Sequence, residues 1–205
     1  MTMTSEAPRR TQRERRESSI RKLLDATCES LIEVGYANTS IQQICSRAGL
    51  SHGGLFRHFS SRLALIIAVA DEVNNALIDQ FAQRFQALRE QQDPFRLALS
   101  LLRDNCRARD NEAWFELIMA ARTDAALREA MQPIWQENRR RTLDIAQRLF
   151  PSEYADHPDF PVLVDCIVSQ FHGEAINAFV EQDASADLAR LECTLTLVDR
   201  YLNKG

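Results

Sequence analysis

The chain has 205 residues, of which 45% are hydrophobic and 26% charged, and its formal net charge is −4. That balance is typical of a globular protein, and the length accommodates a small domain together with a larger one. The sequence holds no run of about 18 apolar residues, and residues 1–16 are polar and arginine-rich. We therefore predict neither a membrane-spanning helix nor a secretory signal, and expect a cytoplasmic protein.

Five cysteines are scattered along the chain without a Cys-x-x-Cys pair: Cys28, Cys45, Cys106, Cys166 and Cys193. An odd, dispersed set in a cytoplasmic protein favours neither a disulfide framework nor a zinc site. The sequence also offers no Ser/His/Asp arrangement, metal-ligand spacing or phosphate-binding loop. We therefore expect no cofactor, no metal and no catalytic residues, and a small helical enzyme is the less favoured alternative.

The charge is unevenly distributed. Residues 1–62 carry 10 lysines and arginines against 6 acids, whereas residues 63–205 carry 15 against 23. The amino-terminal 62 residues are therefore basic and the rest of the chain is acidic, as is typical of a protein that binds a polyanion through one end. A solvated surface explains an imbalance of this size equally well, so the charge alone does not decide.

The composition favours helices, because only 6 glycines and 6 prolines occur. We expect residues 1–13 to be a disordered basic arm, whose arginines either contact DNA or stay solvated. From about Glu14 to Val34, apolar residues recur at three- and four-residue spacing, which predicts a helix. Gly35 is suited to end this helix, because glycine readily adopts the left-handed conformation found there.

Two short helices are predicted next. Thr39 and Ser40 each offer an N-cap, because a glutamine follows each of them by three residues. The first of these helices ends at Gly49, and Ser51 caps the second. Three side chains of the second helix and its end are expected to point inward: Leu55, Phe56 and Phe59.

Six further helices are predicted over residues 62–88, 93–109, 112–121, 124–149, 161–181 and 186–203. Prolines at positions 151, 158 and 161 mark a loop between the helix over residues 124–149 and the helix over residues 161–181. The expected fold class is all-α. A three-helix domain over residues 14–62 is joined by a long helix to a larger helical domain over residues 63–205.

Residues 39–59 read TSIQQICSRAGLSHGGLFRHF and carry the clearest motif. Two helices that cross steeply need a small residue where they touch, which is Cys45, and a glycine in the turn, which is Gly49. Three apolar residues pin the second helix from inside: Ile44, Leu50 and Leu55. This pattern predicts a helix-turn-helix over residues 39–58.

The outward face of the second helix also carries information. Besides its cap, it exposes His52, Gly53, Gly54, Arg57 and His58. Two adjacent glycines cost a helix about 1 kcal/mol each relative to alanine, so they indicate that something must approach the backbone closely. A DNA backbone or base edge meets that description. A plain helical hairpin with a glycine-rich turn is the alternative.

Several residue groups occur at unbroken spacing: Gly35-Tyr36, Thr39-Ser40, Ile44-Cys45, Ala48-Gly49-Leu50-Ser51, Gly53, Leu55-Phe56, His58-Phe59 and Ser61-Arg62. With them, the chain resembles the amino-terminal domain of the TetR family of transcriptional regulators over about residues 15–75. The resemblance implies a helix-turn-helix domain that binds DNA, joined to a helical domain for dimerisation and effector binding.

The resemblance implies DNA contacts for ten residues: Ser40, Gln42, Ser51, His52, Gly53, Gly54, Phe56, Arg57, His58 and Arg62. Phosphate contacts are implied for Ser40, Ser51, Gly54, His58 and Arg62. Base-edge contacts are implied for Gln42, His52 and Gly53, and Arg57 would reach bases or backbone. Phe56 stands where the family has a tyrosine, so one hydroxyl-to-phosphate hydrogen bond is lost.

A single short reading helix recognises few base pairs, so we expect a homodimer on palindromic double-stranded DNA. The helices over about 161–181 and 186–203 are more apolar than one core-facing stripe requires. Their apolar residues are Val162, Leu163, Cys166, Ile167, Phe171, Ile176 and Phe179, then Leu188, Leu191, Leu195, Val198 and Leu202. We expect these two helices to form the dimer interface, with burial in a monomer core as the alternative.

The resemblance further implies a small-molecule effector. The residues available to bind it are Trp114, Phe115, Met119, Trp135, Phe171 and His172. A mostly apolar lining favours an apolar or amphipathic effector. The predicted function is therefore a DNA-binding transcriptional repressor released by a small, largely apolar molecule. An activator, a regulator without an effector, or an interaction module that no longer binds DNA are the alternatives.

Overall fold

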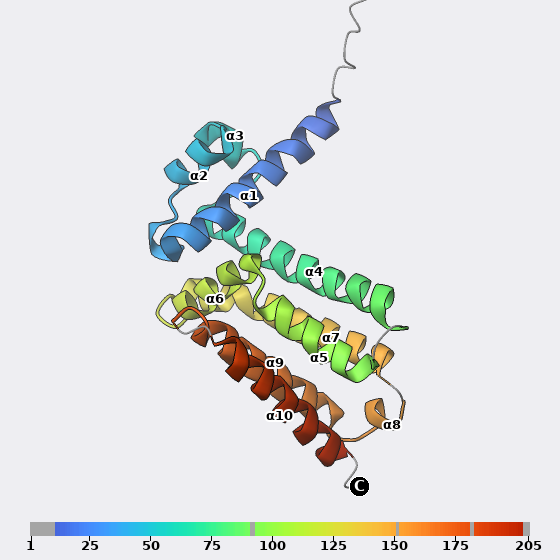
Figure 1. Ribbon diagram of the computed structural model, residues 1–205. Coiled ribbons are helices and arrows are strands. Elements are labelled where there is room, and N and C mark those ends of the chain that lie inside the picture. Colours follow the sequence, from blue (N-terminus) through green and yellow to red (C-terminus); the bar gives the residue numbers. More distant parts are fainter. Residues whose placement is uncertain (1–10, 91–92, 151, 181–182, 203–205) are drawn as a thin grey trace, which may run out of the picture. The chain divides into compact units, whose positions relative to one another are not determined.

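The computed structural model describes residues 11–90, 93–150, 152–180 and 183–202, and all of its regular elements there are helices (Figure 1). The predicted all-α fold class is therefore confirmed. The arm residues Arg9 and Arg10 and the loop residue Pro151 lie outside the described ranges. The chain divides into two compact units, Met1–Val69 and Ala70–Gly205. In the part of the chain that is described, no helix combines the length and apolarity needed to cross a membrane.

The first unit opens with α1 (Gln12–Asn38). Thr11 caps this helix, because its hydroxyl accepts from the Glu14 N–H while the Glu14 carboxylate accepts from the Thr11 N–H. The helix thus begins two residues earlier than expected, and Arg13 belongs to it rather than to an arm. Gly35 interrupts the helix with φ 77° and ψ 168°, and one further turn follows before it ends.

The next two helices are α2 (Ile41–Ala48) and α3 (His52–Phe56), and the fourth, α4 (Arg62–Leu88), begins in the first unit and continues into the second. A small apolar core holds the first unit together. Its fully buried side chains include Leu23, Leu31, Ile44, Leu55, Leu65 and Ile66. Burying side chains of this size contributes about 1.5–3 kcal/mol each, which fixes the short helices α2 and α3 against α1.

One inward-facing prediction is wrong. Leu55 is fully buried and Phe59 is partly buried, but Phe56 is 52% exposed. Because α3 has only five residues, it has one narrow buried face, and the residue after Leu55 is turned about 100° away from that face. Phe56 is therefore a surface aromatic beside the other exposed residues of α3.

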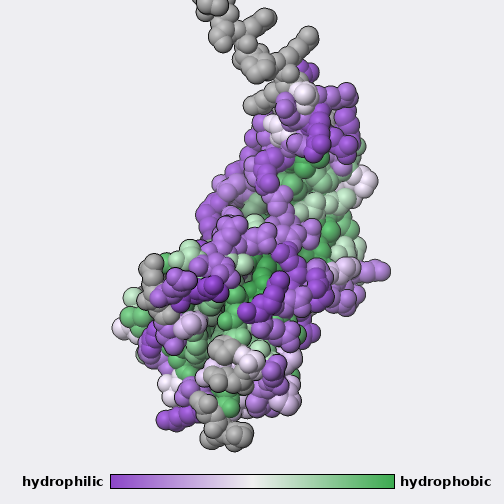
Figure 2. Space-filling view, turned by 90° about the vertical axis from the view of Figure 1, so that its right-hand side faces the viewer, coloured by the Kyte–Doolittle hydropathy of each residue, from purple (hydrophilic) through white to green (hydrophobic). Residues whose placement is uncertain are grey.

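The second unit contains most of α4 and six further helices. They are α5 (Pro94–Cys106), α6 (Arg109–Ala121), α7 (Ala125–Leu149), α8 (Ser152–Ala155), α9 (Phe160–Asn177) and α10 (Ala184–Leu202). The sequence predicted all of these except the four-residue α8 in the proline-rich loop. Helix α5 packs against both α9 and α10, and α7 packs against α6 and α9. Polar residues cover most of the face in Figure 2, with apolar patches showing between them.

A cluster of ion pairs joins α5, α9 and α10 inside the second unit. Arg103 Nε lies 3.2 Å from Glu174 Oε2, and Arg103 Nη2 lies 3.3 Å from Asp187 Oδ2. These contacts are ion pairs without hydrogen-bond geometry, whereas Arg107 Nη2 donates to Asp187 Oδ1 at 2.9 Å. Arg103 and Glu174 are both buried, so each charge depends on the others for compensation.

Candidate functional site

Two serines fix the beginnings of the helices in the helix-turn-helix. The Ser40 hydroxyl accepts from the Gln43 N–H at 3.2 Å, and the Ser51 hydroxyl accepts from the Gly54 N–H at 3.1 Å. Of the two predicted caps for α2, Ser40 is the one used, since the buried Thr39 donates its hydroxyl to the Gly35 carbonyl at 2.8 Å. Both cap serines are exposed, so each hydroxyl is free to donate its proton to an acceptor outside the chain.

The turn between the two helices has the predicted chemistry. Gly49 adopts the left-handed conformation, with φ 64° and ψ 34°, and the Leu50 N–H donates to the Cys45 carbonyl at 3.0 Å. Cys45 is buried, and this burial raises the pKa of its thiol. It therefore serves as a small uncharged residue in the core of the first unit.

Among the described residues, neither the backbone conformation nor a close neighbour requires glycine at positions 53 and 54. Neither has a positive φ. A Cβ on Gly53 would meet only the Ser51 hydroxyl oxygen, at 4.0 Å, and one on Gly54 would meet the same atom at 3.4 Å and Leu50 Cβ at 3.9 Å. These are ordinary contacts, so α3 carries the cost of two glycines without an internal benefit. The missing side chains leave room for an external backbone or base edge.

The side chains predicted to contact DNA are mostly exposed around these glycines. They are Gln42 on α2, His52 and Phe56 on α3, and Arg57 at the end of α3. His58 differs, because it is partly buried and its Nδ1 has no hydrogen-bond partner among the described residues. The helix-turn-helix thus presents an amide, an imidazole, a phenyl ring and a guanidinium group beside the two glycines of α3.

Arg62 has a role inside the first unit that the sequence did not predict. Its Nε donates to the Thr39 carbonyl at 2.6 Å, Nη2 donates to the Tyr36 carbonyl, and the guanidinium lies 4.3 Å from the centre of the Tyr36 ring. These contacts tie the start of α4 to Tyr36 in the last turn of α1 and to Thr39, which follows that helix. A phosphate contact by Arg62 is a prediction, whereas its structural contacts are observed.

The apolar residues expected at a dimer interface divide between two faces of α9 and α10. Buried within the second unit are Ile167, Phe171, Leu191 and Val198, and partly buried are Leu163, Leu195 and Leu202. Exposed are Val162, Cys166, Ile176, Phe179 and Leu188. The first group faces the core of its own unit, and the exposed group leaves a second apolar face uncovered.

On α9 this second face forms a regular stripe, which we call the α9 stripe: Val162, Cys166, Ser169, Gly173 and Ile176. Alternating steps of four and three residues place all five on one side of the helix. Its centre is made of small residues, and a Cβ on Gly173 would meet nothing within 4 Å. The stripe is therefore shaped for close approach of another helix.

The six residues expected to bind an effector do not surround one cavity. Trp114 stacks on Trp135 with ring centres 5.8 Å apart, and Phe115 meets His172 edge to face at 5.3 Å. Burial lowers the pKa of His172 below its ordinary value, which favours a neutral imidazole.

Three residues of this group lie where they line no described cavity. Met119 is 57% exposed and Trp135 is 42% exposed, while Phe171 is fully enclosed in the core. None of the three lines a described cavity, whereas Trp114 and His172 line a small polar cavity. Their part in effector binding stays a prediction.

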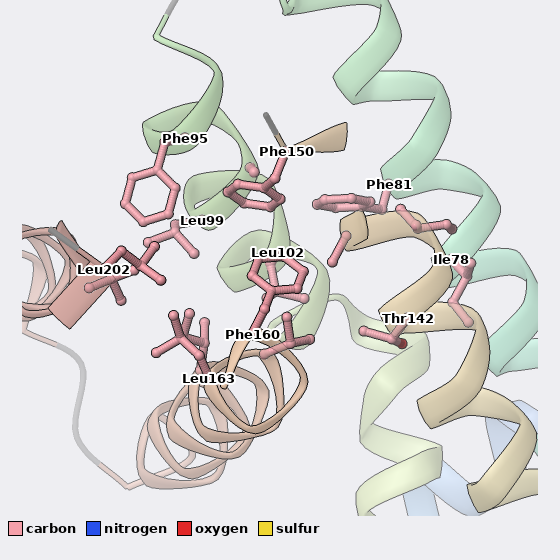
Figure 3. Close-up of a pocket in the computed structure, with 16 residues that line it drawn as sticks. Ile78, Phe81, Phe95, Leu99, Leu102, Thr142, Phe150, Phe160, Leu163 and Leu202 are labelled. Atoms are coloured by element: carbon pink, nitrogen blue, oxygen red, sulfur yellow. The ribbon is translucent and has the colours of Figure 1, made fainter. Parts of the chain in front are cut away.

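A different set of residues encloses the apolar cavity of the second unit (Figure 3), whose volume is about 80 Å³. It is lined by α4, α5, α7, α9 and α10. Phe81, Phe95, Phe150 and Phe160 contribute rings, and Thr142 supplies the one polar side chain among the lining residues. The sequence does not predict this cavity, because each lining residue occupies an ordinary core position of its own helix.

One sequence signal for the cavity exists. Phe95 follows Pro94, Phe150 precedes Pro151, and Phe160 precedes Pro161. Prolines mark helix ends, so these three aromatics lie at helix ends and can meet at one end of a bundle. In the structure the Phe150 ring indeed lies 5.5 Å from that of Phe95 and 5.7 Å from that of Phe160.

Comparisons with known proteins agree with this geometry. Residues 23–69 match the family model of the bacterial regulatory proteins of the tetR family. The uncharacterized HTH-type transcriptional regulator Rv2912c of Mycobacterium tuberculosis is 36% identical over 167 residues, which cover 82% of this chain and 86% of the relative. CymR, an HTH-type transcriptional regulator of Pseudomonas putida, is 27% identical over 175 residues, which cover 85% of this chain and 86% of CymR.

The fold comparison gives the same result over nearly the whole chain. The crystal structure of a TetR family transcription regulator from Marinobacter aquaeolei VT8 has a TM-score of 0.62 and 18% sequence identity. The alignment covers 91% of this chain and 96% of that chain. At this identity the likeness shows a shared fold, and the contacts with DNA or effector rest on the residues of this chain.

Proposed function

The chain belongs to the TetR family of bacterial regulatory proteins and is a DNA-binding transcriptional regulator, and we propose that it is a homodimeric repressor. It binds a palindromic operator and is released by a small, largely apolar effector. The observation that carries the proposal is the outward face of α3, where a Cβ on Gly53 or Gly54 would meet only ordinary contacts within the described residues, so an outside molecule is the reason for both glycines.

The DNA contacts follow from that face. Gln42, His52 and Arg57 are exposed side chains with hydrogen-bond donors, suited to base edges in the major groove. The exposed caps Ser40 and Ser51 offer hydroxyl donors to phosphate oxygens. Phe56 adds an exposed ring that contacts DNA by packing alone, since it has no hydroxyl.

The α9 stripe supports the homodimer. A solvent-exposed stripe of this kind favours association, and its small central residues let two copies of α9 cross closely. Helix α10 also exposes large apolar or aromatic side chains, Leu188, Leu197 and Tyr201, all at least 48% exposed. Two-fold pairing through α9 and α10 joins two helix-turn-helix domains in one dimer, and a palindromic site requires two such domains.

Release by an effector follows from a population shift. A molecule that binds better to the conformation unable to hold the operator weakens DNA binding by its difference in affinity for the two conformations. The apolar cavity enclosed by five helices and Phe150 supports this step, because filling it changes how α4, α5, α7, α9 and α10 pack together.

The direct test is selection of genomic fragments by the purified protein, followed by titration of the best fragment and of random duplex at several salt concentrations. We expect enrichment of a palindrome, two chains per site, and affinity that falls steeply with salt. A protein that enriches no sequence and shows no salt dependence would overturn the proposal.

A further inference from the structure

The apolar cavity and the small polar cavity of the second unit adjoin each other. The polar cavity has a volume of about 60 Å³ and is lined by four asparagines, Asn74, Asn105, Asn111 and Asn138, together with His172. The two cavities share the lining residues Leu102 and Thr142. A molecule in one cavity therefore lies next to the other.

The same helices line both cavities in the same direction. On α5 the lining changes from Phe95 at the apolar end to Asn105, and on α7 it changes from Ala146 to Asn138. Helices α4 and α9 repeat the change, toward Asn74 and His172. Along all four helices the lining side chains thus change from apolar to polar in the same direction. This arrangement is what a single cavity with an apolar body and a polar end would have.

The hydrogen bonds of the polar end leave acceptors unused. The amide groups of Asn105 and Asn111 donate to the Leu77 and Cys106 carbonyls, at 2.7 and 2.9 Å. Asn138 donates to Asn74 Oδ1 at 2.6 Å. Within the described residues, no hydrogen bond reaches the side-chain oxygens of Asn105, Asn111 and Asn138. Asn111 is buried and Asn105 and Asn138 are partly buried, so their oxygens are acceptors available to a hydrogen-bond donor inside the cavity.

Charge is absent from the lining of both cavities. No lysine, arginine, aspartate or glutamate is among the residues that line them in the described part of the chain. A charged ligand would lose its hydration here without gaining a counter-ion. A neutral ligand with a hydrogen-bond donor is the chemistry that fits.

We propose that the two cavities form one effector site for a neutral molecule with a hydrocarbon body and a single hydroxyl group. The body lies among Phe81, Phe95 and Leu99, and the hydroxyl donates to the asparagine oxygens beyond Thr142. Together the cavities hold roughly ten water-sized groups at about 10–15 Å³ each, which suits one ring with a short chain. This inference rests on the proposed function and names the ligand class of its effector.

The test compares three molecules with one skeleton, 4-propylphenol, propylbenzene and 4-propylbenzoate, by calorimetric titration of the full chain at pH 7. We expect the phenol to bind tightest, the hydrocarbon at least about tenfold more weakly, and the benzoate without measurable affinity. Benzoate binding as tight as the phenol, or equal binding of phenol and hydrocarbon, overturns the inference.

Two variants locate the binding. Ala146→Leu fills the apolar body and is expected to lower the affinity for both phenol and hydrocarbon at least about tenfold. Asn138→Leu removes an acceptor and is expected to bring the phenol within about threefold of the hydrocarbon. Ala126→Leu and Gln136→Leu, exposed on the same helix and outside both cavities, are the matched controls. Unchanged affinities in both cavity variants would contradict the site.

The proposed ligand class and the proposed function can be contradicted independently of each other. If the phenol binds but leaves operator affinity unchanged, the ligand class stands and release by this effector is wrong. If none of the three molecules binds while the protein still selects a palindrome, the DNA-binding function stands and the ligand class is wrong.

Discussion

In the first unit, every residue proposed to contact DNA lies between Ser40 and Arg62, on two short helices and the turns beside them. In the second unit, the residues around the apolar cavity are drawn from positions as distant as Ile78 and Leu202. Local sequence patterns for caps, turns and glycines therefore predict the residues of the proposed DNA site directly. The effector site depends on how five helices meet, which no short segment determines.

The two units nevertheless share one signature. Gly53 in α3 and Gly173 in α9 are exposed helical glycines, and a Cβ on either would meet no close neighbour in its own chain. In both places the chain gives up helix stability where another molecule is proposed to approach, DNA in one and a second copy of α9 in the other. Substitutions in one unit should therefore change DNA binding, and substitutions in the other should change dimerisation or the stability of that unit.

The largest effect is expected in the second unit. Glu174→Ala removes one of the two carboxylates that pair with Arg103 in the described part of the chain and leaves Asp187, so we expect the free energy of unfolding to fall by about 3–5 kcal/mol. Both tryptophans lie in this unit, so tryptophan fluorescence during denaturation reports its unfolding. The control is Arg103→Met with Glu174→Leu, which keeps the Arg107–Asp187 pair and should lie close to the parent. A cost equal to that of Glu174→Ala would contradict the argument.

Arg62→Ala tests the first unit in the same way. Losing its hydrogen bonds to two carbonyls and its stacking on Tyr36 should cost about 2 kcal/mol, measured by hydrogen exchange of the buried amides of α2. The matched control is Arg47→Ala, whose pair with Glu33 is partly exposed and should cost less than about 1 kcal/mol. Equal costs for the two variants would show that Arg62 has no special structural role.

A pH-dependent effect should appear in the second unit. Hydrogen bonds from Arg107, and then from Arg190, hold the pKa of Asp187 well below its ordinary value. Its stabilising contribution is therefore present above about pH 4, where an unfolded aspartate is ionised, and is lost as the pH falls further. Asp187→Asn should cost roughly 2 kcal/mol at pH 7, with the difference shrinking below pH 4.

Thermal unfolding at a series of pH values measures this difference. Asp71→Asn, an exposed aspartate on α4, is the control and should follow the parent at every pH. A cost of Asp187→Asn that is the same at pH 3 as at pH 7 would rule out the carboxylate as its source.

The smallest stability changes, and the sharpest comparison, come from the glycine pair. Gly53→Ala and Gly173→Ala should each stabilise the protein by up to about 1 kcal/mol. Gly53→Ala should weaken operator binding about tenfold, as a mismatched base pair does, without changing the dimer. Gly173→Ala should raise the dimer dissociation constant measured by sedimentation. If either substitution changes stability alone, close approach is not the reason for that glycine.

The fold could be read from the sequence almost completely, because caps, prolines and apolar spacing are local signals. Ser51, Gly49 and Pro94 mark helix boundaries that the structure reproduces. Besides the four-residue helix α8 and the apolar cavity, the surroundings of two side chains escaped this reasoning. Phe56 was expected inside, because apolar type outweighed its position on a five-residue helix, and Arg62 was not expected to contact the Tyr36 and Thr39 carbonyls across the chain.

The effector residues show the limit more clearly. Trp114, Phe115 and Met119 are predicted to bind an effector because aromatic and sulfur-containing residues cluster in that part of the sequence. Two of the three are buried, and Met119 faces solvent, while the apolar cavity is bounded by residues from five other stretches of the chain, several phenylalanines among them. A cavity arises from what several helices leave unfilled between them, and composition along one helix carries no record of that space.

The central claim is that the outward face of α3 reads DNA sequence. Its most direct test is the ratio of affinities for the selected palindrome and for random duplex, measured for the parent, Arg57→Ala and Arg47→Ala at one salt concentration. We expect Arg57→Ala to lower this ratio by about 5- to 150-fold, equivalent to about 1–3 kcal/mol, and Arg47→Ala to leave it unchanged. An Arg57→Ala protein that keeps the parent's ratio would contradict the account.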